Sequence, residues 1–164
     1  MKIELKNIKY AAFASEETSC YEATLWVDGK KIGHVSNDGR GGCDNFHGVH
    51  AAYKVADEWC VSNLPNRVYT TEKDGFDAIH QQNLEYLCGM LLEEHLTAKD
   101  LAKALSSKAL FTIHGKDGLF IKKYKGSAKP DERLFESVRT AHPGAVILNT
   151  LPREEALKIY KESI

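Results

Sequence analysis

The stretch Tyr21-Glu22-Ala23-Thr24-Leu25-Trp26-Val27-Asp28-Gly29 decides the fold of the first part of the chain. Its apolar residues at every second position give one continuous face, which is the period of a half-buried β-strand. Asp28-Gly29 is a strong signal for a tight hairpin turn. The returning strand is expected over 31–36. This strand-turn-strand unit predicts antiparallel β structure.

The residues on either side extend this unit to a β-meander followed by a helix. An earlier strand is predicted over 3–10, with a slip of the alternation at Asn7 that indicates a bulge. From about Phe46 onward the apolar residues follow helical spacing, and Asp44 or Asn45 is expected to cap this helix. The residues on the apolar face of the helix are Val49, Ala52, Tyr53, Ala56 and Cys60.

The rest of the chain predicts helices and a second β region. Residues 62–75 carry no clear period and are expected to form a loop, and a long amphipathic helix is expected over 76–91. A shorter helix is expected to restart at Thr97. Strands are predicted over 110–114 and 119–124 as a hairpin, and the chain is expected to end in helix-strand-helix order after Pro130.

These elements predict an α+β fold: an N-terminal antiparallel β-meander followed by a helix, then two helices, a β-hairpin, and a helix-strand-helix ending. We expect one compact domain over 1–164. Two lobes, 1–62 and 76–164, joined by a loop, are the alternative.

Composition excludes several classes of protein. The 164 residues are 43% hydrophobic and 27% charged, which is typical of a globular chain. The formal net charge of −1 gives no global attraction to nucleic acid or to a membrane surface. The N-terminus is typical of a strand rather than a signal peptide, no apolar run is long enough for a membrane span, and the four cysteines form no C-x-x-C pair. We therefore expect a cytoplasmic protein with reduced thiols and no membrane partner.

The least generic segment is the Gly-rich loop over 36–50. Three glycines within four positions indicate positive φ angles or a close approach to the backbone. If the loop leads from a strand into a helix, its N–H groups are free to bind an anion such as a phosphate. The candidate anion-binding residues are Asn37, Gly39, Arg40, Gly41 and Gly42. The alternative is a long turn that uses these residues for ordinary turn chemistry.

Cys43, His47 and His50 are candidate metal ligands in the same segment. With a helix beginning near Phe46, the two histidines would lie one turn apart with the cysteine just before them. The cofactor is left open, with zinc as one metal that suits this set of donors, and Cys43 is also a candidate nucleophile. The spacing is not a familiar zinc pattern, so the alternative is that these side chains are structural or simply exposed to solvent.

A second candidate surface is the predicted C-terminal hairpin. Basic and aromatic residues together on a strand are typical of nucleic-acid contacts. The candidate residues are Phe120, Lys122, Lys123 and Tyr124. The alternative is an edge strand whose lysines prevent pairing with another chain.

Two resemblances accompany these patterns. Residues 21–33 and the alanine-rich helix after them resemble the β-β-β-α half of a double-stranded-RNA-binding domain, although the lysines of that family's phosphate-binding loop are missing, so the resemblance implies shared architecture only. Residues 13–18, together with Ser36-Asn37-Asp38-Gly39 and Gly41-Gly42-Cys43-Asp44, resemble uncharacterised small accessory proteins of bacteria, phages and plasmids. That resemblance implies a mobile-element setting and no particular activity.

Two functions remain open at this point. One is an accessory protein that binds a macromolecule, with a protein as the expected partner and nucleic acid as the alternative, through the Gly-rich loop and the helix beside it. The other is a small hydrolase or transferase that acts on a phosphorylated ligand at the same loop, with Cys43, His47 or His50 as the chemical groups.

Overall fold

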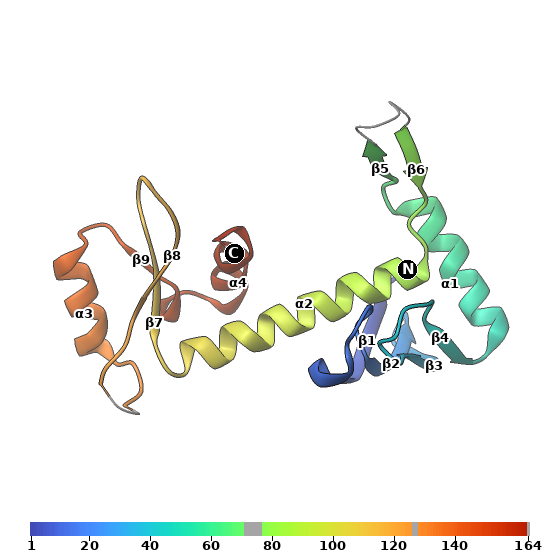
Figure 1. Ribbon diagram of the computed structural model, residues 1–164, viewed down its shortest axis with the longest axis horizontal. Helices are drawn as coiled ribbons and strands as arrows, with labels where there is room; N and C mark the ends of the chain where they lie inside the picture. The colour runs from blue at the N-terminus through green and yellow to red at the C-terminus, as the bar shows by residue number, and fades with distance from the viewer. Residues whose placement is uncertain (71–76, 126–127, 164) are drawn as a thin grey trace. The chain divides into compact units, whose positions relative to one another are not determined.

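The computed structural model describes residues 1–70, 77–125 and 128–163, and its contacts divide the chain into two compact units (Figure 1). The first unit is Met1–Glu93 and the second is Glu94–Ile164. The boundary lies inside helix α2 (Leu84–Leu105) and not in the loop that the two-lobe alternative would place between the lobes. Because this division does not bear on whether either unit folds alone, the expectation of one domain stays a prediction.

A four-stranded antiparallel sheet forms the start of the first unit; the sequence predicts its first three strands as a meander and misses the fourth. Its strands follow one another in space in chain order. They are β1 (Ile3–Tyr10), β2 (Tyr21–Val27), β3 (Lys30–Asn37) and β4 (Asn45–Gly48). The alternating residues of β2 point to the core, where Leu25 is fully buried together with Val35 of β3.

Two irregularities predicted from the sequence are confirmed. Asn7 has a φ of 53°, and the pairing of β1 with β2 shifts register between Lys6 and Lys9, so a bulge interrupts β1 there. Asp28 and Gly29 have φ angles of 46° and 78°. Positive φ at both central residues is what a tight two-residue hairpin turn requires.

Helix α1 (His50–Asn63) follows the sheet, but it begins later than the sequence predicts. Residues 45–48 pair with β3 as strand β4, so they are unavailable to a helix, and Val49 occupies the capping position. The expected cap at Asp44 or Asn45 is therefore wrong. Of the predicted apolar face, Tyr53, Ala56 and Cys60 are buried, whereas Val49 precedes the helix and is exposed.

Tyr53 fixes α1 against the sheet through its hydroxyl group. The Tyr53 oxygen lies 2.5 Å from the carbonyl oxygen of His47 and 3.2 Å from that of His34. It occupies space that two glycines leave open, because a Cβ added at Gly33 would lie 1.8 Å from this oxygen and one at Gly48 would lie 2.8 Å from it. The close approach of α1 to β3 and β4 therefore depends on glycine at both positions.

The segment predicted as a loop over 62–75 contains a strand. Strand β5 (Arg67–Thr70) pairs antiparallel with β6 (Asp77–His80). The expected helix over 76–91 was wrong at its start: Phe76 lies outside the described residues, Ile79 belongs to β6, and α2 begins at Leu84. A four-residue strand has too short a pattern to be separated from a loop without its partner.

Helix α2 is one continuous helix and not the two that the sequence predicts. Its first turn is capped twice, because the Asp57 carboxylate accepts from the N–H of Leu84 at 2.9 Å and the Asn83 side chain accepts from the N–H of Tyr86 at 3.0 Å. The apparent restart at Thr97 lies inside the helix. A threonine followed three residues later by an aspartate, Asp100, is compatible with a helix interior, so the capping pattern alone was misleading.

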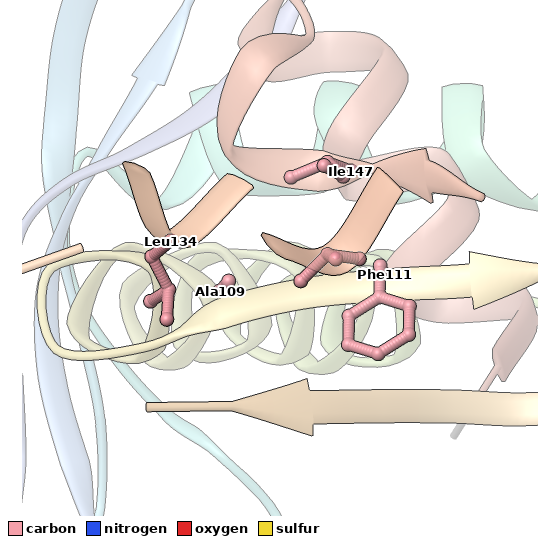
Figure 2. Close-up of a cluster of buried hydrophobic side chains, with 5 residues drawn as sticks. Ala109, Phe111, Leu134 and Ile147 are labelled. Carbon is pink, nitrogen blue, oxygen red and sulfur yellow. The ribbon is translucent and has the colours of Figure 1, made fainter. Parts of the chain in front are cut away.

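The second unit is built on a three-stranded antiparallel sheet in the order β8-β7-β9. The strands of this sheet are β7 (Ala109–Ile113), β8 (Lys116–Lys122) and β9 (Val146–Ile147). Two helices accompany the sheet, α3 (Glu132–Ala141) and α4 (Arg153–Ser163). Figure 2 shows a cluster of buried side chains that joins the sheet to α3, including Phe111, Leu134 and Ile147. The helix-strand-helix ending is present, and the α+β fold class predicted from the sequence is confirmed.

Asn149 closes the C-terminal end of α2 in this unit. Its amide nitrogen donates to the carbonyl oxygens of Leu105 and Lys108, both at 3.0 Å. Its amide oxygen accepts from the N–H of Leu110 at 2.9 Å. One side chain therefore supplies partners to the last turn of the helix and to the strand that follows it.

We predict opposite effects of alanine at two glycines. Gly33→Ala should lower the free energy of unfolding by at least about 3 kcal/mol, because the new methyl group meets the Tyr53 hydroxyl and the His47 backbone. Gly89→Ala is the matched control: Gly89 lies within α2 with nothing near its absent Cβ, so alanine should add about 0.5–1 kcal/mol. Denaturant unfolding measures both, and a mild Gly33→Ala would contradict the packing.

Candidate functional site

Two loops of the first unit bind each other, and we call them the loop pair: residues 11–20, between β1 and β2, and residues 38–44, between β3 and β4. The carbonyl oxygen of Gly39 accepts three backbone N–H groups of the other loop. These come from Glu16 and Glu17 at 2.9 Å each and from Thr18 at 3.3 Å. The Gly-rich loop is therefore anchored to the neighbouring loop by backbone hydrogen bonds.

Asn37, at the end of β3, is the centre of the loop pair, and only 7% of its surface is exposed. Its amide oxygen accepts from the Thr18 hydroxyl at 2.7 Å and from the N–H of Gly39 at 2.9 Å. Its amide nitrogen donates to the carbonyl oxygen of Gly42 at 3.2 Å and to the Asp44 carboxylate at 3.1 Å. The hydrogen-bonding capacity of a buried amide is thus fully used.

Asp44 is a partly buried carboxylate at the end of the loop pair. It accepts hydrogen bonds from the Tyr21 hydroxyl and from Asn37, and its own N–H donates to Glu85 at 2.8 Å. Burial raises the pKa of Asp44, the two hydrogen bonds act in the opposite direction, and the charge of Glu85 adds to the rise. The pKa of Tyr21 is also raised, first by burial and then by its bond to Asp44.

Three backbone N–H groups of the expected anion site already have acceptors within the chain. The N–H of Gly39 donates to Asn37, that of Arg40 to Asp38 at 3.2 Å, and that of Gly41 to Thr18 at 3.3 Å. These donors were expected to be free because the loop was expected to lead into a helix. It leads into β4 instead, so that expectation was wrong at these three positions, and the alternative of turn chemistry describes them better. Gly42 contributes its carbonyl oxygen to Asn37.

The structure does not bring Cys43, His47 and His50 together as a metal site. Cys43 is exposed in the loop pair, His47 lies on β4, and His50 is the first residue of α1. The two histidines are not one helical turn apart, because the helix begins only at His50. Throughout residues 1–70, 77–125 and 128–163, no group of three or more histidine, cysteine, aspartate or glutamate side chains is placed to hold a metal ion.

The aromatic residues of the C-terminal hairpin face the core of the second unit. Phe120 stacks on Phe111 with ring centroids 5.8 Å apart, and both Phe120 and Tyr124 pack against the buried cluster. Lys122 donates to the carbonyl oxygen of Ser137 at 3.1 Å, and Lys123 is exposed. The expected platform for stacking nucleic-acid bases is therefore not presented to solvent. Strand β8 does lie at the edge of its sheet, as the alternative of a guarded edge strand requires.

The most exposed aromatic side chain among the described residues is one that the sequence patterns do not single out. Phe13 is 94% exposed and lies in the 3-10 turn Ala12–Ala14 at the tip of the loop pair. The turn is tied down, because the Ser15 hydroxyl donates to the carbonyl oxygen of Ala11 at 3.0 Å and accepts from the N–H of Cys20 at 2.8 Å. The available signal was a lone phenylalanine among small residues in a segment with no strand or helix period.

A shallow groove of about 400 Å³ adjoins the loop pair. It runs over the ends of β1, β2 and β3 and includes part of the second loop. Its lining combines the half-exposed ring of Tyr10 with polar and charged side chains. Residues that line it include Lys9, Tyr10, Glu22, Asn37, Asp38 and Asn45.

Comparison with known protein families, with curated proteins and with solved structures finds no match to this chain. The two resemblances carried by the N-terminal residues therefore stay predictions. Among the described helices, none combines the length and the apolar character that crossing a membrane requires.

We predict that alanine at Gly39 disrupts the loop pair far more than alanine at Gly42. Both glycines have positive φ, which costs other residues about 1–2 kcal/mol. A Cβ at Gly39 would in addition lie 2.1 Å from the carbonyl oxygen of Ala14, whereas nothing lies near one at Gly42. Unfolding in urea should show a loss of at least about 3 kcal/mol for Gly39→Ala. Equal losses for the two variants would contradict the interlocked loops.

The raised pKa of Asp44 predicts a pH dependence of stability. A folded-state pKa above the ordinary value of 3.8 means that the folded protein binds the proton more tightly than the unfolded chain. The contribution of Asp44 to stability is therefore greatest below that value and is lost as pH rises through the folded-state pKa. Asp44→Asn removes this dependence, so the stability of the wild type relative to the variant should fall from about pH 4 to about pH 7.

Urea unfolding across this pH range measures the difference between wild type and variant. Asp117→Asn, which changes an exposed carboxylate in the second unit, is the control. A difference that stays constant or rises with pH would contradict the assignment to Asp44.

Proposed function

We propose that this chain is a non-enzymatic binding protein whose loop pair engages a protein partner, with Phe13 as the apolar anchor. The observation that carries the proposal is the 94% exposure of this ring on a turn that is tied by side-chain and backbone hydrogen bonds. The accessory role in a bacterium or mobile element, and the cytoplasmic setting, are kept as parts of the proposal.

The exposed Phe13 ring would gain burial energy in a partner's pocket, and its turn, already ordered, would lose little conformational entropy on binding. Burying a phenylalanine side chain in a partner's pocket contributes about 1.5–3 kcal/mol. A segment that is already ordered loses little conformational entropy on binding, so more of that energy appears as affinity. Aromatic residues near the centre of an interface carry much of the binding energy in protein complexes. Phe13 combines these properties.

The charges around Phe13 indicate the chemistry of the partner. Glu16, Glu17 and Asp38 are exposed carboxylates of the loop pair, and Arg40 is its exposed cation. The rim is therefore acidic on balance. Complementary charges at the rim of an interface raise the association rate and exclude wrong partners. A partner with an apolar pocket surrounded by basic side chains fits this surface, and a nucleic-acid backbone does not.

The enzymatic alternative has less support. A phosphate-binding loop needs unoccupied N–H groups, and those of Gly39, Arg40 and Gly41 already have acceptors within the chain. General acid-base or nucleophilic catalysis also requires reactive side chains within hydrogen-bond reach of one another. Cys43, His47 and His50 lie on a loop, a strand and a helix start, and no contact joins them.

We predict that Phe13 cross-links to one partner and controls its affinity. A photo-reactive phenylalanine analogue at position 13 should yield a dominant protein adduct in cells of the source. The same analogue at Val55, an exposed position on α1, is the matched control. With the partner purified, Phe13→Ala should weaken binding by about 2–4 kcal/mol, or roughly 30- to 1000-fold, in calorimetric titration.

Val55→Ala should leave the affinity of that partner unchanged. An adduct equally strong at both positions, or a partner whose binding is unaffected by Phe13→Ala, would rule out the anchor role.

A further inference from the structure

The sheet of the first unit carries a pair of histidines on its outer face. His34 of β3 and His47 of β4 are direct partners in the antiparallel register. The next pair in that register, Val35 with Phe46, lies on the inner face, where Val35 is fully buried and the Phe46 ring lies 5.3 Å from that of Tyr53. Because side chains alternate between the faces of a sheet, both imidazoles project outward, and both residues are exposed.

The spacing of this pair suits a shared ligand. Residues directly opposite each other on antiparallel strands have Cβ atoms about 4.5–5.5 Å apart, which lets both rings reach one atom between them. The backbone at both positions is also held, because the Tyr53 hydroxyl lies within hydrogen-bond distance of the carbonyl oxygens of His34 and His47. The pair is thus placed by the same contact that fixes α1 on the sheet. A site built on a fixed pair of strands has little to reorganise when a ligand binds.

We propose that His34 and His47 together bind one late first-row divalent transition-metal ion, with water completing its coordination. Imidazole nitrogens suit copper, nickel and zinc, whereas magnesium and calcium prefer oxygen ligands. Affinity should follow the general order for such donors, with Cu²⁺ bound more tightly than Ni²⁺ or Zn²⁺. The pair differs from the set expected from the sequence, because it replaces Cys43 and His50 with a residue of the neighbouring strand.

A carboxylate that is itself paired with Lys9 lies near the two histidines, and the site is open to solvent. Glu22 of β2 lies diagonally across from His34 on the same face, since its direct partner is Ser36. Lys9 chiefly, and His34 to a smaller extent, hold the pKa of Glu22 below its usual range, so a carboxylate charge stands near the pair. In the described part of the chain no third side chain joins the pair to form a larger ligand group. Water or an outside ligand would therefore occupy the remaining coordination positions.

The test is a titration of the full chain, purified without chelator or affinity tag, with Cu²⁺ and separately with Ni²⁺. Isothermal calorimetry should show one ion bound per chain. His34→Asn and His47→Asn should each weaken binding by at least about tenfold, the lower end of the loss seen when even the supporting partners of metal ligands are changed. His50→Asn and Cys43→Ser are matched controls, because they change the other two members of the donor set expected from the sequence, and both should bind as the wild type does.

A spectroscopic readout distinguishes copper held by both histidines from copper bound nonspecifically elsewhere on the surface. Electron paramagnetic resonance of the copper complex should show coupling to two imidazole nitrogens in the wild type and to one in each variant. Circular dichroism shows whether each variant is folded, which is expected because the changed side chains are exposed. Copper binding that survives in both histidine variants, that is lost in His50→Asn or Cys43→Ser, or that is missing in the wild type would overturn the proposal.

Discussion

The loop pair depends on the side chain of one buried amide, that of Asn37. These loops contribute few apolar side chains to the core, so hydrophobic burial does not hold them together. Their backbone groups nevertheless lie partly away from water and need partners. Asn37 supplies two acceptor positions and two donor hydrogens within a short side chain, and all four are used by the two loops and Asp44. This network adds to the Ser15 hydrogen bonds that hold the exposed Phe13 turn in place.

A second constraint, the Tyr53 hydroxyl between two glycines, serves both faces of the sheet. On the inner face it brings α1 against β3 and β4 at a distance that side chains at Gly33 or Gly48 would prevent. On the outer face it fixes the backbone of the two residues whose imidazoles face solvent. A change that loosens the packing inside is therefore expected to shift the backbone of the histidine pair outside.

Local patterns predicted the elements that depend on local physics. The alternation of β2, the bulge at Asn7 and the Asp28-Gly29 turn each follow from neighbours in sequence, and each is present. Strand β4 was missed because Asn45 to Gly48 becomes a strand only through its pairing with β3, and the placement of His47 was lost with it. Of the three occupied donors in the Gly-rich loop, only that of Gly41 has an acceptor set by the tertiary fold, the Thr18 hydroxyl. Those of Gly39 and Arg40 bond to side chains two residues earlier, which is the local turn chemistry of the alternative interpretation.

The hydrogen bond from the Asp44 N–H to Glu85 links the loop pair to the first turn of α2. Helix ends fray on their own, and the amide protons of a first turn normally exchange quickly with solvent. Here the opening of that turn and the loosening of the loops share one contact, so they are energetically coupled events. If a partner that binds Phe13 holds the loops more firmly, the first turn of α2 should open less often. The amide protons around Glu85, a position remote in sequence, would then exchange with deuterium more slowly.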